Sequence, residues 1–176
     1  MVEALVVIDI VRDIFELPVP LHEPERFVAN VAELLSRARA AGSLIVHIQP
    51  TGAEGTRYAP GAPGRQFHPQ TAPVAGEIVI EKYHPDAFHG TNLEELLVDR
   101  SVGGVAMCGF ASDYCVDATV RSGYAHGFDV VLAADAHTTT ANEVLSAADT
   151  ISHHNVVLRR FAKVTPAAEI QFQRAD

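Results

Sequence analysis

Residues 102–120, VGGVAMCGFASDYCVDATV, change from one structural pattern to another within a few positions. Val102 to Gly109 is an apolar run of strand length, and Ser112 suits the N-cap of a helix that contains Cys115. An apolar strand that leads directly into a helix is typical of a parallel sheet with crossover helices. The stretch therefore predicts an α/β fold.

The same alternation of apolar runs and helical periodicity continues on both sides of this stretch. Five more strands are predicted, at residues 4–10, 44–48, 77–82, 129–134 and 156–160. Helices are predicted at residues 25–41, 91–100 and 140–155, the last two opened by capping boxes. Six strands with right-handed crossovers predict one domain over residues 1–176, built on an open, doubly wound parallel sheet. Such sheets bind ligands at the carboxyl ends of their strands.

The composition argues against several classes of partner. Of 176 residues 48% are hydrophobic, and 13 Lys and Arg against 22 Asp and Glu give a formal charge of −9. This charge repels phosphate backbones and anionic lipids, so nucleic acid and membrane surfaces are poor partners. No apolar run approaches the roughly 20 residues of a membrane helix, and the N-terminus does not resemble a signal peptide. Two cysteines are too few for a disulfide framework, so a cytoplasmic protein is expected.

Three reactive side chains stand at the ends of predicted strands. Asp9 ends the first strand, Lys82 ends the third, and Cys115 opens the helix after the fourth. At a helix N-terminus and near a lysine, the pKa of the Cys115 thiol is expected to be lowered, which favours the nucleophilic thiolate. Asp9 would take the thiol proton and deliver it to a leaving amine, with Lys82 holding both groups in place.

Each of these residues also has a structural explanation. A cysteine on an apolar helix face is usually a small buried hydrophobe, as Cys108 within its apolar strand is expected to be. Asp9 could cap a loop and Lys82 could be a solvated strand end. The conjunction of all three at strand ends favours the catalytic interpretation.

Around these residues the sequence resembles the isochorismatase-like cysteine hydrolases, a superfamily that includes nicotinamidases and carbamoyl-amide hydrolases. The resemblance runs through nearly the whole chain. It rests on Val7-Ile8-Asp9-Ile10 with Phe15, on Glu81 to Phe88, on Gly109 to Val116 with Ala118-Thr119, and on Asp135-Ala136.

The resemblance implies a three-layer, Rossmann-like fold with a six-stranded parallel sheet and an Asp-Lys-Cys triad at Asp9, Lys82 and Cys115. It implies a cis peptide bond between Phe110 and Ala111, which would turn the Ala111 N–H toward the Cys115 N–H to form an oxyanion hole. It also implies an enzyme without a cofactor, acting on a small molecule as a homo-oligomer, a dimer or larger.

Two departures from the family pattern bear on the substrate. Val11 stands where the family commonly has Gln, so one polar contact to substrate or water is missing. The Asp-x-His metal motif of nicotinamidases is absent from the corresponding stretch. His47 and His68 are the nearest imidazoles, and without a paired carboxylate they do not predict a metal site. Nicotinamide is therefore a less favoured substrate.

Five further residues are candidates for binding the substrate: Phe15, Gln49, His84, Phe88 and Tyr114. The long loop at residues 49–76 is rich in Pro and Gly and is expected to cover the pocket, from the same subunit or a neighbouring one. Loops carry specificity without a readable code, so the substrate stays open.

Three functions are compatible with the sequence. The first is hydrolysis of the C–N bond of a small amide by Cys115 through an acyl-enzyme. The second is hydrolysis of an isochorismate-like vinyl ether, in which Asp9 protonates the substrate and no nucleophile is needed. The third is a non-catalytic binding protein that keeps the fold, for which only Val11 argues. The presence of Cys115 and of the whole trio favours the first.

Overall fold

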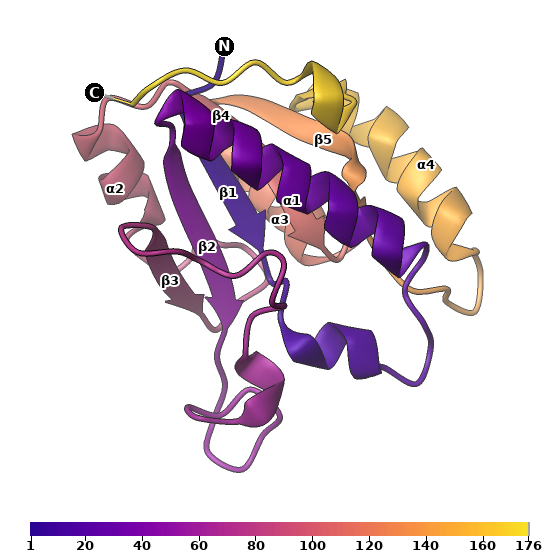
Figure 1. The fold of residues 1–176 in the computed structure, drawn as a ribbon. Coiled ribbons are helices and arrows are strands. Elements are labelled where there is room, and N and C mark those ends of the chain that lie inside the picture. The colour runs from indigo at the N-terminus through magenta and orange to yellow at the C-terminus, as the bar shows by residue number, and fades with distance from the viewer. Residues whose placement is uncertain (176) are drawn as a thin grey trace.

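A computed structural model describes residues 1–175, which form a six-stranded parallel sheet flanked by helices (Figure 1). The strands are β1 (Ala4–Ile8), β2 (Leu44–Pro50), β3 (Ile78–Lys82), β4 (Gly104–Phe110), β5 (Asp129–Thr138) and β6 (Lys163–Thr165). The α-helices are α1 (Pro24–Ala41), α2 (Leu93–Asp99), α3 (Cys115–Ala125) and α4 (Ala147–Val157). This arrangement confirms the predicted α/β fold with a six-stranded parallel sheet.

The order of the strands places the site. The sheet runs β3-β2-β1-β4-β5-β6, so the direction in which strands are added reverses between β1 and β4. At such a switch point the loops leaving two neighbouring strands diverge and leave a crevice at their carboxyl ends. Asp9 directly follows β1, and Cys115 follows β4 after a short loop. The topology therefore brings both residues to the crevice.

Two apolar layers hold the sheet between its helices. Alternate residues of β1 enter opposite layers: Val6 and Ile8 pack with α2 and α3, whereas Leu5 and Val7 pack with α1. In Figure 1, α1 lies across the front of the sheet and α3 behind it. A central strand covered on both faces must be apolar at every position, which explains the uninterrupted run in β1.

Gly109 brings the ends of β1 and β4 together. Its φ is 132°, and a Cβ built there would lie 2.1 Å from the carbonyl oxygen of Ile8. Only glycine fits such a conformation and such an approach. Because Ile8 directly precedes Asp9, this close contact fixes the distance between the loop that carries Asp9 and the loop that carries Cys115.

Two predicted elements of the C-terminal half are wrong. Residues 156–160 form the end of α4 and a 3-10 helix, Leu158–Arg160, and the sixth strand is Lys163–Thr165. The helix predicted from residue 140 begins at Ala147, after Ser146 accepts the Asp149 N–H at 3.1 Å. Residues 156–158 are β-branched or apolar and favour a strand locally, but Leu158 is buried in the core from a helical position.

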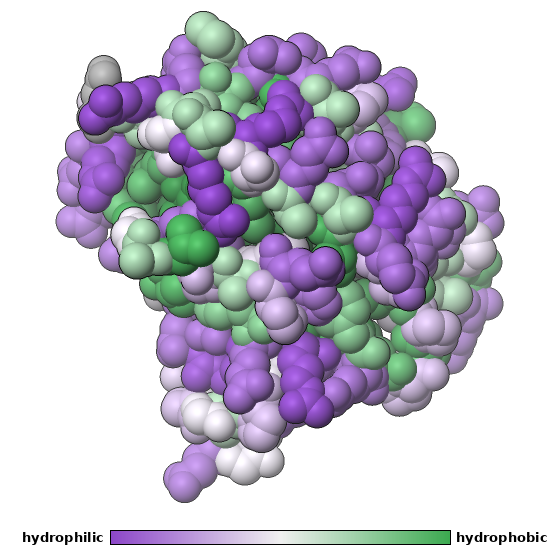
Figure 2. Space-filling model, in the orientation of Figure 1, coloured by the Kyte–Doolittle hydropathy of each residue, from purple (hydrophilic) through white to green (hydrophobic). Residues whose placement is uncertain are grey.

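The surface is mixed. Figure 2 shows hydrophilic side chains over much of the face seen in Figure 1, with apolar residues between them. Within residues 1–175, none of the helices is both long and apolar enough to cross a membrane.

Candidate active site

One ammonium group joins the three side chains singled out from the sequence. The Lys82 Nζ lies 2.7 Å from Asp9 Oδ2 and 3.2 Å from Cys115 Sγ, and it donates a further hydrogen bond to the His84 carbonyl at 3.1 Å. An ammonium has three hydrogens, so each has a partner. The structure therefore brings Asp9, Lys82 and Cys115 together in one buried cluster.

Lys82 reaches this cluster from a distant strand. β2 separates β3 from β1, so Lys82 starts about 10 Å, two strand spacings, from the strand that precedes Asp9. Pro50 pairs with Lys82 at the carboxyl end of β2, and the chain beyond it leaves the sheet. The long lysine side chain crosses this end of the sheet and is buried, with 4% of the residue's surface exposed to solvent.

Asp9 has an unusual backbone and a free oxygen. Its φ is 55°, in the left-handed region that few residues other than glycine adopt, and such conformations are concentrated at functional sites. Its N–H donates to the Ile48 carbonyl at 3.0 Å, which anchors it to β2. Oδ2 contacts Lys82, while Oδ1 is buried and has no hydrogen-bond partner within residues 1–175. That oxygen is available to a substrate or a proton.

The electrostatics of the cluster correct the expected ionisation of Cys115. Burial, reinforced by the negative charge of Asp9, raises the pKa of the Cys115 thiol to about 12, against the opposing effect of Lys82. Burial also raises the pKa of Asp9, although Lys82 opposes it. For Lys82 burial acts to lower the pKa, but the nearby Asp9 and Cys115 outweigh it and the pKa is raised. Lys82 is thus paired with Asp9 at 2.7 Å and lies beside a thiol whose ionisation is opposed by burial and by the charge of Asp9.

The backbone before Cys115 offers two hydrogen-bond donors. Cys115 is the first residue of α3, and the Ala111 carbonyl accepts the N–H groups of Tyr114 and Val116, each at 3.0 Å. In the part of the chain that the structure describes, the N–H groups of Ala111 and Cys115 make no hydrogen bond to another backbone group. The peptide bond between Phe110 and Ala111 is cis, as the family resemblance implied.

Ser112 does not cap α3 as predicted. The residue before the helix is Tyr114, and no side chain caps it. The Ser112 side chain instead lies 2.7 Å from Nδ1 of His137 and is completely buried. The preference for serine at helix N-caps predicted that the Ser112 hydroxyl bonds to a backbone N–H of α3, whereas it bonds to His137.

The predicted substrate-binding residues do not all lie at the cluster. The carbonyl of His84 contacts Lys82, and Tyr114, which precedes Cys115, is exposed. The Phe15 ring packs against His68, with centroids 4.8 Å apart. The Gln49 side chain is occupied by Arg65, which accepts one hydrogen bond from it at 2.7 Å and donates another at 3.1 Å. Phe88 is buried in the core against Phe128.

The histidines named as the nearest imidazoles have other neighbours. His47 Nε2 lies 2.9 Å from Glu77 Oε2, so it does have a carboxylate partner, contrary to the expectation from sequence. Within residues 1–175 no group of three or more His, Cys, Asp and Glu side chains is arranged to hold a metal. Val11 is completely buried and pairs with Phe67, so it serves the core where the family pattern has a polar residue.

Tyr58 and its neighbours were not found from sequence. Burial, together with the negative charges of Asp13 and Asp9, raises the pKa of Tyr58 to about 12. Asp13 also forms an ion pair with Arg57 at 2.5 Å, which ties the loop that carries Tyr58 to the segment after Asp9. The aperiodic sequence of this loop gives no signal beyond the general expectation that long loops are functional.

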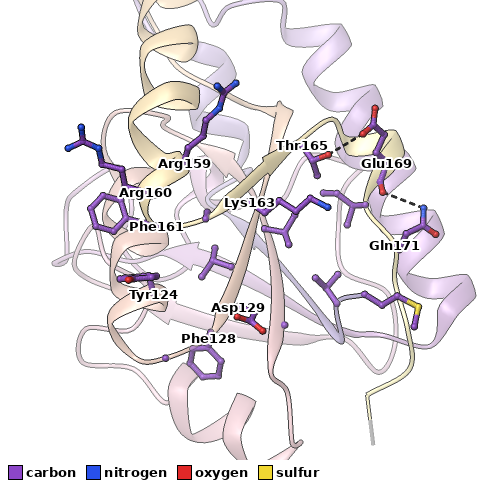
Figure 3. Close-up of a pocket in the computed structure, with 18 residues that line it drawn as sticks. Tyr124, Phe128, Asp129, Arg159, Arg160, Phe161, Lys163, Thr165, Glu169 and Gln171 are labelled. Atoms are coloured by element: carbon purple, nitrogen blue, oxygen red, sulfur yellow. Dashed lines mark hydrogen bonds between the residues drawn. The ribbon is translucent and has the colours of Figure 1, made fainter.

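A cavity of about 730 Å³ lies at the opposite edge of the sheet (Figure 3). It is lined by residues that begin strands, including Gly104, Asp129 and Lys163. In Figure 3 the Arg159 and Arg160 side chains extend outward, away from Lys163 and Asp129. None of the three clustered residues lines this cavity, so it is separate from the chemistry at the carboxyl ends of the strands.

Comparison with known proteins gives consistent relatives. A family model described as an isochorismatase domain matches residues 3–169. A streptothricin hydrolase of Streptomyces noursei is 40% identical over 138 residues, which are 78% of this chain and 55% of that protein. A maleamate amidohydrolase of Pseudomonas putida is 32% identical over 146 residues, 73% of this chain and 68% of that protein. The chain spans about half the length of the streptothricin hydrolases that it matches.

Solved structures agree. The crystal structure of an isochorismatase from Pseudomonas putida KT2440 matches with a TM-score of 0.90 and 35% identity, over 96% of this chain and 90% of that one. The likeness extends over nearly the whole sheet and its helices, so the fold and the order of its elements are shared.

Proposed function

This chain belongs to the isochorismatase family, and we propose that it is a cysteine-dependent hydrolase of the C–N bond of a small amide. One observation carries the proposal: a single buried ammonium, Lys82 Nζ, contacts both the carboxylate of Asp9 and the sulfur of Cys115. A nucleophile next to a base, with a third group that orients both, is the arrangement of covalent hydrolytic catalysis.

The first step forms the acyl-enzyme. Transfer of the thiol proton from Cys115 to Asp9 leaves the total charge of the cluster at zero, so burial does not oppose it as it opposes loss of the proton to solvent. The thiolate attacks the amide carbonyl, and the N–H groups of Ala111 and Cys115 receive the developing oxyanion. Asp9 then delivers its proton to the nitrogen as the C–N bond breaks, and ammonia or an amine leaves.

The second step releases the acid. Asp9, again a carboxylate, accepts a proton from water, and the hydroxide attacks the thioester carbonyl. The C–S bond breaks, the carboxylic acid departs, and the proton on Asp9 returns to the Cys115 sulfur. Lys82 stays charged throughout and pairs with whichever neighbour carries the negative charge. These steps use only groups of the protein, and we propose no cofactor or metal.

The relatives support an amide of a small molecule. The names of two of them describe a hydrolase of streptothricin and an amidohydrolase of maleamate. We further propose that the protein acts in the cytoplasm as a homo-oligomer, a dimer or larger. The two cysteines are free, which is compatible with a reducing compartment.

One observation favours a second candidate, vinyl-ether hydrolysis. Burial raises the pKa of Asp9, which favours the protonated acid that such a reaction needs. In that reaction Asp9 protonates the substrate and Cys115 is dispensable. The Cys115→Ala variant separates the two: it abolishes amide hydrolysis and leaves vinyl-ether hydrolysis intact.

A screen tests the proposal. The purified protein is incubated with maleamate and a panel of other small amides and ureas, with ammonia release as the readout, and with isochorismate in parallel. We expect turnover of at least one amide by the native chain and none by Cys115→Ala. Turnover of isochorismate alone, or amide turnover that survives Cys115→Ala, contradicts the mechanism.

A further inference from the structure

A chain of buried hydrogen bonds runs from α4 to the loop before Cys115. Asn155 Nδ2 donates to the Ala134 carbonyl at 2.9 Å, Asn155 Oδ1 lies 3.0 Å from His137 Nε2, and His137 Nδ1 lies 2.7 Å from Ser112 Oγ. Ser112 has no exposed surface and His137 has 3%. Within residues 1–175, none of these side chains forms a hydrogen bond or ion pair with Asp9, Lys82 or Cys115.

The direction of each hydrogen bond follows from its chemistry. A carbonyl only accepts, so the Asn155 amide nitrogen must face Ala134 and its oxygen must face His137. His137 therefore carries its proton on Nε2 and accepts at Nδ1, where the Ser112 hydroxyl donates. Burial lowers the pKa of His137, which keeps the ring neutral as this chain of bonds requires. We call Ser112, His137 and Asn155 the buried relay.

The middle residue of the relay, His137, directly follows an irregularity in β5. The pairing of β4 and β5 moves from Met107 opposite Leu132 to Gly109 opposite His137, so residues 133–136 bulge out of register. The bulge is held from two sides: Asn30 of α1 donates to the Asp135 carbonyl at 2.6 Å, and the Ala167 N–H donates to Asp135 Oδ1 at 2.7 Å. His137 thus leaves the bulge at a position set by several elements.

At its Ser112 end the relay holds the loop that presents the N–H groups of Ala111 and Cys115. The Ser112 N–H donates to the Thr138 carbonyl at 2.9 Å, and the Thr139 hydroxyl donates to Asp113 Oδ1 at 2.6 Å. Ser112 is therefore fixed through both its backbone and its side chain. It directly follows Ala111 and lies three residues before Cys115.

We propose that Ser112, His137 and Asn155 are positioning residues that hold the Ala111 and Cys115 N–H groups in the geometry that receives an oxyanion. This inference rests on the proposed function. The three residue types resemble a serine hydrolase triad, but a hydroxyl without exposed surface cannot meet a substrate, so Ser112 is not a second nucleophile.

Two probes of Cys115 separate positioning from reactivity. Small aldehydes, for which we choose acetaldehyde, butyraldehyde and benzaldehyde, add reversibly to the thiol, and the adduct oxygen needs the two N–H groups. Iodoacetamide alkylates the same sulfur without forming an oxyanion. Aldehyde affinity is measured as protection of Cys115 against iodoacetamide, with mass spectrometry identifying the labelled cysteine.

The variants are Ser112→Ala and Asn155→Leu, which remove the two ends of the relay. Thr150→Val is the matched control, because Thr150 is also buried on α4 and its hydroxyl has no hydrogen-bond partner within residues 1–175. Urea unfolding of each variant establishes that it is folded under the conditions of the assay.

We expect Ser112→Ala and Asn155→Leu to weaken aldehyde binding about 10- to 100-fold while the alkylation rate changes less than about threefold. The double variant should lose no more than the more damaging single one, because the residues act in series. Thr150→Val should match the native chain.

If both variants bind the aldehydes as tightly as the native chain, the positioning role of the relay is wrong, while the proposed function stands. Equal losses in aldehyde affinity and alkylation rate also overturn it, since they indicate a general disturbance. Failure of the native chain to bind any of the three aldehydes counts instead against the proposed function and the oxyanion role together.

Discussion

Replacing Asp9 by Asn should make Cys115 more reactive and the enzyme inactive. In the native cluster Lys82 pairs with the Asp9 carboxylate, and the same charge opposes ionisation of the thiol. Asn keeps the size of the side chain and removes the charge. In the variant the Cys115 thiolate is the anion with which Lys82 pairs, so the cluster with an ionised thiol becomes neutral.

The size of the effect follows from the geometry. Asp9 Oδ2 and Cys115 Sγ both contact Lys82 Nζ, at 2.7 and 3.2 Å, so they are at most about 6 Å apart. At an effective dielectric constant of about 20, a unit charge at that distance contributes about 3 kcal/mol, or about two pKa units. A thiolate of lower pKa is intrinsically less nucleophilic, which offsets part of the gain and leaves about a tenfold faster alkylation near neutral pH.

The assay is the rate of alkylation by iodoacetamide as a function of pH. Because the native Cys115 pKa is about 12, its rate should still rise about tenfold per pH unit between pH 7 and 10, whereas the Asp9→Asn profile should bend earlier. Cys108 is completely buried and should stay unlabelled as an internal control. Amide turnover should fall by about 10²- to 10⁴-fold, the usual contribution of a general base. Slower alkylation of Cys115 in Asp9→Asn refutes the reasoning.

Three further predictions concern Lys82, Gly109 and the requirement for a metal. Lys82→Met should slow alkylation of Cys115 at least tenfold and lower the free energy of unfolding by about 3–5 kcal/mol, because it leaves Asp9 buried without its partner; unchanged stability by urea unfolding would contradict this. Gly109→Ala should lower the free energy of unfolding by about 3 kcal/mol or more, or prevent folding, because the new Cβ would lie 2.1 Å from the Ile8 carbonyl oxygen. Gly127→Ala is the control: a Cβ there has no atom within 4 Å, so the variant should lose only about 1 kcal/mol of stability, owing to its positive φ. Dialysis against EDTA should leave amide turnover unchanged, and lost activity that zinc restores would show a metal requirement.

Much of the fold could be predicted from the sequence because the central strands are apolar at nearly every position. β1 and β4 are buried on both faces, so their runs are unmistakable and their order along the chain suffices to predict a parallel sheet. The elements at the end of the chain could not be predicted in the same way. Residues 156–158 look like a strand, and only the packing of Leu158 decides for a helical turn.

The candidate site was predictable in position and not in its supporting contacts. Strand ends are readable from sequence, so Asp9, Lys82 and Cys115 could be expected at one edge. The partner of Ser112 could not be predicted, because His137 reaches it only through the bulge in β5, and the sequence Ala-Ala-Asp-Ala at residues 133–136 does not indicate a bulge.

The expected lowering of the Cys115 pKa was wrong in direction, and the reason bears on mechanism. A helix N-terminus and a nearby lysine both favour the thiolate, and both are readable from sequence. Burial and the charge of Asp9 oppose it, and they depend on how closely the three groups pack. In a buried cluster the cost of a net charge exceeds that of moving a proton within it. In the proposed mechanism the thiolate is therefore formed by proton transfer to Asp9, and turnover should require both Asp9 and Cys115.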